Sequence, residues 1–220
     1  MTPNNIVNMS LINELDIIAL SDHNTCGNTE AIAAVADKAG LVFVPAMELE
    51  TAEEIHVLCL FPDTDSALAF EREIVRPALP DVSNNEKIFG EQVLYDFMDN
   101  PIGKDDRYLI NATSITIDSV GELVSGFGGV AIPAHIDKDT KSLISVLGMA
   151  DESMGYKKFE LSKNAPSEFH KTQFSLKDMD YNYIHDSDAH YLYDIADRAS
   201  AGFFEFDSKP TPQKIIDFLK

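Results

Sequence analysis

The stretch Gly128-Gly129-Val130-Ala131-Ile132-Pro133-Ala134-His135 predicts the fold more strongly than any other part of the chain. Its short apolar run is typical of a buried strand in a parallel sheet, and it ends in a residue that can bind a metal. The same pattern recurs in Ile17–His23, Val42–Glu48 and Tyr183–His190. In α/β barrels the carboxyl ends of the strands meet at one mouth, which holds the active site. The pattern therefore predicts an α/β barrel with its chemistry at that mouth.

The rest of the chain alternates between apolar patterns of helical and strand period. Candidate ligands follow at least four strands, which favours a barrel over an open doubly wound sheet with a single switch point. We predict one domain over residues 1–220. The expected helices lie at 2–15, 29–39, 63–74, 117–127, 142–147, 167–174 and 212–219, and further strands at 55–61, 157–161 and 203–206.

Residues 76–112 interrupt this alternation with a segment rich in Pro and Asn. We predict an insertion within the barrel domain, containing two short strands at 92–97 and 108–112. An insertion of this length serves either as a cover for the barrel or as a lid that selects the substrate. The sequence leaves both roles open.

Acidic residues dominate the charge of the chain. The 220 residues include 37 Asp and Glu against 17 Lys and Arg, a formal net charge of −20. Such a charge repels nucleic acid, whereas a small phosphorylated ligand is compatible with it where bound cations reverse the local field. No stretch approaches the roughly 20 apolar residues of a membrane span. Two cysteines, Cys26 and Cys59, do not make a disulfide framework, so we expect a cytoplasmic protein with no membrane partner.

Six residues at or near strand ends are candidate metal ligands, because imidazole and carboxylate groups bind zinc, manganese and iron. Three of them have another explanation when taken singly, whereas His135, at the end of its apolar run, is harder to dismiss. The segment Asp22-His23-Asn24 is also typical of a turn, Glu48 of a solvated loop, and His56 of a hydrogen-bonded core histidine. Asp188 and His190 are two residues apart and so face the same side of an extended segment. The candidates are His23, Glu48, His56, His135, Asp188 and His190, while His170 and His185 are left out of the site.

These segments resemble motifs of the PHP (polymerase and histidinol phosphatase) family. The resembling segments are Asp22–Thr25, Glu48 with Ile55–Val57, Gly128–His135 and Ser187–His190, in the family's order. The resemblance implies a distorted (β/α)7 barrel that holds up to three metal ions. It also implies one metal position formed by Glu48, His56 and His135, a second that uses Glu48 and Asp188, and a third that uses His23 and His190.

The sequence departs from this family at its start. The family's first motif is a His-x-His on the first barrel strand, and the chain contains no His-x-His. Its first predicted element is a helix, so we expect a barrel that lacks the first strand. A start site placed at an internal Met, or a truncated copy of a longer ancestor, would explain this.

The resemblance favours a metal-dependent phosphoesterase that hydrolyses a small phosphorylated metabolite, either a nucleotide or a sugar or amino-alcohol phosphate. The predicted cofactors are Zn, Mn or Fe ions. The alternative is a non-catalytic metal-binding or regulatory barrel with an incomplete site. A proofreading module of a polymerase is disfavoured by the charge. The residues predicted to act in catalysis are Asp22, Asp188 and His190, and those predicted to bind the phosphate are Lys138 and Arg198.

Overall fold

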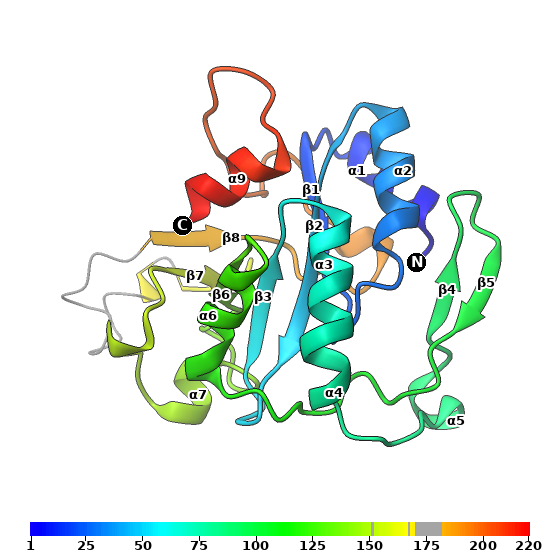
Figure 1. Ribbon diagram of the computed structural model, residues 1–220. Helices are drawn as coiled ribbons and strands as arrows, with labels where there is room; N and C mark the ends of the chain where they lie inside the picture. The colour runs from blue at the N-terminus through cyan, green and yellow to red at the C-terminus, as the bar shows by residue number, and fades with distance from the viewer. Residues whose placement is uncertain (151, 167, 170–181) are drawn as a thin grey trace.

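The computed structural model describes residues 1–150, 152–166, 168–169 and 182–220 (Figure 1). Within them the α-helices are α1 (Pro3–Ile12), α2 (Thr29–Ala39), α3 (Thr64–Phe70), α4 (Arg76–Ala78), α5 (Glu86–Phe89), α6 (Ile117–Gly126), α7 (Leu143–Leu147) and α9 (Pro212–Leu219). The strands are β1 (Ile17–Leu20), β2 (Val42–Glu50), β3 (His56–Leu60), β4 (Val93–Tyr95), β5 (Pro101–Lys104), β6 (Val130–Pro133), β7 (Lys158–Leu161) and β8 (Asn182–His185). Most of the helix predicted at 167–174, including His170, lies outside the described residues.

Four strands form the central sheet in the order β1-β2-β3-β6. The strands β1, β2 and β6 run in one direction, as the sequence pattern predicts, but β3 is antiparallel to β2 and β6. Only residues 51–55 join β2 to β3, which is too short for the crossover that a parallel pair needs. The reversed direction places His56, the first residue of β3, at the same edge of the sheet as the ends of β2 and β6.

The two faces of β2 have different partners, and this positions the site. Val42, Val44 and Ala46 pack on one face with residues of α9, whereas Met47 and Leu49 pack on the other face in the cluster that includes residues of α3 and α6. Side chains alternate along a strand, so the two carboxylates at the end of β2, on residues 48 and 50, continue the face covered by α9. The helix α9 lies near the top of Figure 1, and α7 lies at the bottom.

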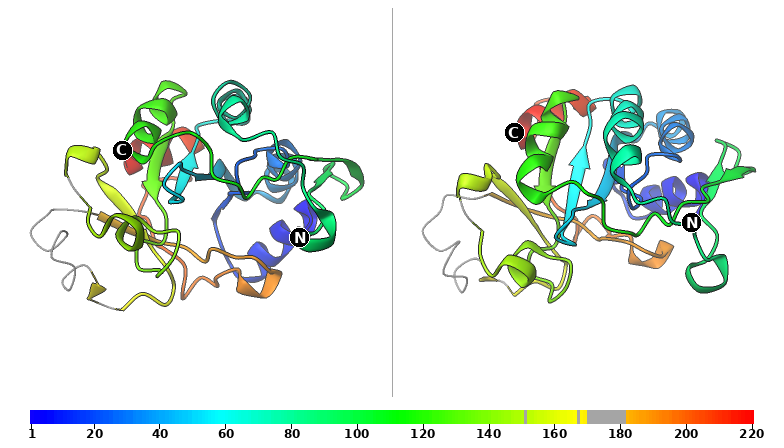
Figure 2. Two further views of the ribbon diagram at one scale, coloured as in Figure 1. Left: turned by 90° about the horizontal axis from the view of Figure 1, so that it is seen from below. Right: turned by 60° about the horizontal axis from the view of Figure 1, so that its bottom comes forward.

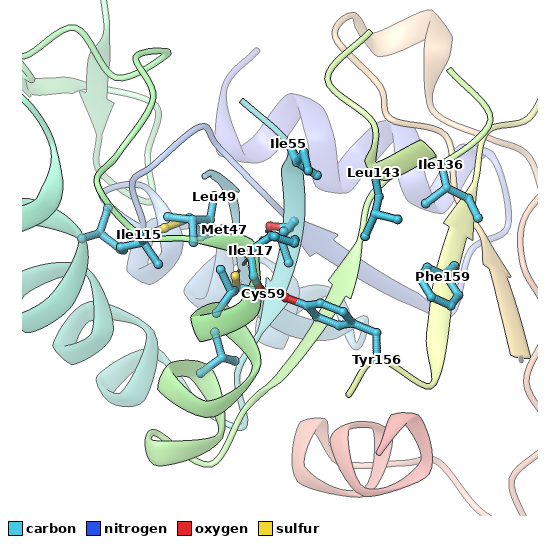
Figure 3. Packing of buried hydrophobic residues seen from close by; sticks show 14 of the residues in the cluster. Met47, Leu49, Ile55, Cys59, Ile115, Ile117, Ile136, Leu143, Tyr156 and Phe159 are labelled. Atoms are coloured by element: carbon cyan, nitrogen blue, oxygen red, sulfur yellow. Dashed lines mark hydrogen bonds between the residues drawn. The ribbon is translucent and has the colours of Figure 1, made fainter. Parts of the chain in front are cut away.

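The larger core cluster lies between the sheet face that carries Met47 and Leu49 and the helices α3 and α6 (Figure 3). Met47, Leu49 and Cys59 are fully buried there. Tyr156 reaches the same cluster, and its hydroxyl donates to the carbonyl of Ile117 at 2.6 Å. This packing fixes β2 and β3 relative to α6, and therefore fixes the strand ends that carry the candidate ligands.

The remaining strands complete an α/β fold. β7 and β8 form a parallel pair, and the amide of Ile136, just after β6, donates to the carbonyl of Glu160 on β7 at 2.9 Å. The predicted α/β class is confirmed, and closure into a (β/α)7 barrel stays a prediction. The strand predicted at 203–206 is wrong: Phe204 and Phe206 pack their rings against Phe218 of α9 without pairing as a strand.

The segment 76–112 contains α4, α5 and the hairpin β4–β5. The strand predicted at 108–112 is wrong, because the partner of β4 is β5. Both views of Figure 2 show the hairpin on the side of the molecule that carries the N-terminus. Asp99 in its turn accepts hydrogen bonds from the Thr2 hydroxyl at 2.7 Å and the Asn4 amide at 3.0 Å. These contacts tie the hairpin to the start of α1.

Candidate metal centre

Glu48 lies at the centre of the site. The turn after β1 docks on it through the backbone: Glu48 N donates to Asp22 O at 3.2 Å, and Asn24 N donates to Glu48 O at 3.0 Å. This pairing sets His23 beside Glu48, with His23 Nδ1 3.1 Å from Glu48 Oε2. The side chain of Glu48 is only 11% exposed. A buried carboxylate needs compensating partners, and imidazoles supply them here.

The other oxygen of Glu48 belongs to a compact triangle of donor atoms. Glu48 Oε1 lies 3.4 Å from His56 Nδ1 and 3.5 Å from His135 Nε2, and those two nitrogens are 3.2 Å apart. Ligands of a tetrahedral zinc with bonds of about 2.0–2.1 Å lie about 3.3 Å from one another. The three spacings therefore match one face of a tetrahedral metal shell, leaving a fourth position for another ligand.

His23, Glu48 and His56 form a second group of donors, with ligand atoms that all lie within 4.8 Å of one another. Glu48 therefore faces His56 and His135 with one oxygen and His23 with the other. The structure thus brings together Glu48, His56 and His135, the three residues predicted for the first metal position. It also places His23, which was predicted for a separate third position, beside Glu48 and His56. The ring centroid of His23 lies 5.1 Å from that of His56 and 6.5 Å from that of His190.

The backbone at two candidate ligands is left-handed. His135 has a φ of 32° and Asp188 a φ of 43°, values that non-glycine residues rarely adopt. Such conformations cost about 1–3 kcal/mol each and concentrate at functional sites, where the surrounding structure holds them. His135 adopts this conformation directly after the buried end of β6, with its Nε2 facing Glu48.

The pKa values show how strongly Glu48 and His56 interact. Burial opposes charge on both groups, but hydrogen bonds and charge attraction outweigh it. The imidazoles of His135 and His56 hold the pKa of Glu48 well below its usual range. Glu48 and Glu50 raise the pKa of His56 to about 9. Burial lowers the pKa of His23. Without a metal, His56 is therefore cationic at neutral pH, and a metal must displace its proton.

Asp188, His190 and Lys138 lie at the next edge of the site. The ammonium of Lys138 contacts Asp188 Oδ2. His190 Nδ1 lies 2.9 Å from the carbonyl of Asp188, and its side chain is exposed. Lys138, predicted to bind the phosphate, is thus paired with a candidate metal ligand.

Asp22 and Arg198 differ in their relation to the site. Asn28 donates to Asp22 Oδ2 at 3.4 Å and to the carbonyl of Val93 in β4 at 3.3 Å, which links Asp22 to the inserted hairpin. Burial raises the pKa of Asp22. Arg198 instead pairs with Asp16 at 3.1 Å, before the start of β1. Arg198 therefore lies at the opposite end of β1 from His23, and its contact with the phosphate stays a prediction.

Sequence reasoning missed three carboxylates at the site. Glu50 is 2% exposed, and its Oε2 lies 3.6 Å from His56 Nε2. Glu160 is 3% exposed, and its Oε1 has no hydrogen-bond partner among the described residues. Burial and the charge of Asp186 raise the pKa of Glu160, and burial with the charges of Asp188 and Glu48 raises that of Asp186 to about 6. The positions of Glu160 in an apolar strand and Asp186 after one were available signals.

The fold is similar to that of several solved hydrolases, although no known family model and no curated protein matches the sequence. A protein from Bifidobacterium adolescentis described as a metal-dependent phosphoesterase matches with a TM-score of 0.59 and 15% identity, over 90% of this chain and 88% of that one. An amidohydrolase from Chromobacterium violaceum, solved with bound sulfate and no metal, matches with a TM-score of 0.56 and 16% identity, over 94% and 86%.

The lesion-specific endonuclease Q from Pyrococcus furiosus matches with a TM-score of 0.53 and 17% identity, over 87% of this chain. The chain spans 44% of that endonuclease. The chain thus shares the fold of these three hydrolases. Within the described residues, no helix is long and apolar enough to cross a membrane.

Proposed function

We propose that this chain is a metal-dependent phosphoesterase that acts on a small phosphorylated metabolite. The observation that carries the proposal is the triangle of Glu48 Oε1, His56 Nδ1 and His135 Nε2, with edges of 3.2–3.5 Å. Its mixture of two imidazoles and one carboxylate suits zinc, manganese or iron. When bound there, such an ion would act as a Lewis acid on a phosphoryl oxygen and lower the pKa of a water.

The residues around the triangle would bind and orient the substrate. The Lys138 ammonium, paired with Asp188, can turn to a phosphate oxygen, because its side chain is 39% exposed. Asp22 is held by Asn28 and has a raised pKa, which suits it to give a proton to the leaving oxygen. His190 is exposed beside Asp188 and so faces an arriving ligand.

The charge of the chain supports a small substrate. A net charge of −20 disfavours the long phosphate backbone of DNA, although a similar fold occurs in an endonuclease that binds an abasic duplex. The sulfate in the C. violaceum structure is a tetrahedral anion of the same shape as phosphate. The free and buried Cys26 and Cys59 are compatible with a reducing, cytoplasmic setting.

The test combines metal analysis with a phosphatase assay on nucleotides and on sugar and amino-alcohol phosphates. We expect one tightly bound metal per chain and activity that a chelator removes. His56→Ala should lose both, whereas His185→Ala, which removes an exposed histidine from β8, should keep both. Full activity of the His56→Ala variant would refute the proposed site.

A second candidate function is a metal-binding or regulatory protein without turnover. The contact of Lys138 with Asp188 favours it, because the ammonium neutralises a carboxylate that a second metal would need. The same experiment separates the two functions. Tight metal binding without hydrolysis of any phosphate ester would support the regulatory protein.

A further inference from the structure

His56 faces a carboxylate with each of its ring nitrogens. Nδ1 lies 3.4 Å from Glu48 Oε1, and Nε2 lies 3.6 Å from Glu50 Oε2. This arrangement follows from the sheet, because Glu50 is directly opposite His56 in the antiparallel pair β2–β3. Opposed residues point to the same face. Glu48 lies two residues before Glu50 on that face, so the imidazole is placed between the two carboxylates.

Glu50 is itself held rigidly. Its amide donates to Asn24 Oδ1 at 3.0 Å, and its carbonyl accepts hydrogen bonds from the amide and the hydroxyl of Thr113 at 3.0 and 2.8 Å. Its buried carboxylate contacts the ammonium of Lys141. Lys141 also accepts the backbone N–H of His56 on its carbonyl at 2.9 Å. The loop after β6 therefore holds both His56 and its acidic partner.

The chemistry of the imidazole turns this geometry into a role. A neutral imidazole has one N–H donor and one acceptor nitrogen, and a carboxylate only accepts. The triangle with Glu48 and His135 requires the Nδ1 lone pair of His56, so the proton must lie on Nε2, facing Glu50. Carboxylates behind metal-bound histidines fix the tautomer in this way.

We infer that Glu50, held by Lys141, is a positioning residue that accepts Nε2–H of His56 and keeps Nδ1 turned toward the metal position. The inference rests on the proposed function, since it requires a metal at the triangle. Glu50 touches neither the metal position nor the substrate in this arrangement. It sets which nitrogen of His56 is available.

The test uses Co²⁺ or Zn²⁺ alone, without a substrate. Replacing an outer carboxylate of this kind weakens metal affinity about 10–100-fold, so we expect Glu50→Gln to weaken binding about 10-fold or more in a chelator competition. Glu54→Gln is the matched control, because Glu54 is the other partner of Lys141 and is 64% exposed. This variant should bind within about twofold of the original chain. Circular dichroism of the three metal-free proteins, recorded below their unfolding transitions, shows whether each of them is folded.

A spectroscopic readout separates positioning from mere packing. In the Zn²⁺-loaded original chain, ¹⁵N–¹H spectra of labelled histidine should show His56 protonated at Nε2 and coordinated through Nδ1. Coordination through Nε2, or a Glu50→Gln affinity equal to that of the original chain, would overturn the inference, and this measurement does not depend on the stability of any variant. A weakened affinity in Glu50→Gln with no phosphatase activity in the original chain would uphold the inference and refute the proposed function.

Discussion

His56 makes the stability of the metal-free protein depend on pH. Its pKa is raised from 6.5 to about 9, against the effect of its burial, by Glu48 and Glu50, whose carboxylate oxygens lie 3.4 and 3.6 Å from its ring nitrogens. A raised pKa stabilises the fold fully below the unfolded value, and the stabilisation is lost as the pH rises through the folded value. At 1.36 kcal/mol per pKa unit, this shift corresponds to about 3 kcal/mol. The free energy of unfolding should therefore fall by that amount between pH 6.5 and a pH above 9.

Urea unfolding with a chelator present measures this effect. With a slope of about 2 kcal/mol per molar urea, the loss of about 3 kcal/mol lowers the midpoint by about 1.5 M. The His56→Gln variant removes the titrating group, so the midpoint difference between it and the original chain should shrink over the same pH range. His185→Gln is the control, since it removes an exposed histidine. The midpoint of this variant should fall with pH as much as that of the original chain does. A midpoint difference between His56→Gln and the original chain that stays constant from pH 6 to pH 10 would refute the assigned charge of His56.

Four further outcomes are expected. Ile132→Ala, at a fully buried position of β6, should lower the free energy of unfolding by about 3 kcal/mol in urea titrations. Lys138→Met should free Asp188 from its ammonium partner and raise the metal stoichiometry measured by elemental analysis above that of the original chain. Replacing the β4–β5 hairpin by a short linker should change the range of phosphate esters hydrolysed while metal content stays constant; loss of metal would show that the hairpin is structural. His170→Ala should keep its metal, because His170 lies in a polar stretch of the sequence.

The pattern of apolar runs that end in a ligand residue predicts much of the site. Buried strands require apolar residues, and these can be read directly from the sequence. β2 is buried along its whole length, β6 at its last two residues and β1 at Ile18, and each presents a ligand at its end or just after it. His56 reaches the same edge by a different route, since β3 runs in the opposite direction. An apolar strand that begins with a polar residue presents it at the same edge of the sheet as an antiparallel neighbour that ends with one. The direction of a strand depends on the length of the connection before it. The five residues between β2 and β3 are too few for a parallel crossover and therefore imply an antiparallel pair.

The residues that the sequence did not predict are those whose environment is set by tertiary contacts. The apolar pattern at Val42–Glu48 stops at Glu48, whereas β2 continues to Glu50, which places Glu50 in a fully buried strand. The sequence around Arg198 shows a cation near the last motif, yet only the fold shows that it lies beside Asp16. A local apolar pattern shows where a strand lies. It does not record how far that strand extends once partner elements cover it.

The electrostatics of the site bear on the proposal that so acidic a chain binds a phosphate ester. Glu48 and Glu50 are compensated by His56 and Lys141, but Glu160 has a raised pKa, through burial and the nearby charge of Asp186. A raised carboxyl pKa of this kind marks a region with too little positive charge. A phosphate adds more negative charge to the same region, and an exposed lysine alone offsets little of it. A divalent cation held by the triangle would reverse the sign of the local field and attract a phosphate oxygen. Phosphate affinity should therefore depend on metal occupancy far more steeply than on ionic strength, and titration of inorganic phosphate into the metal-loaded and metal-free chain measures this.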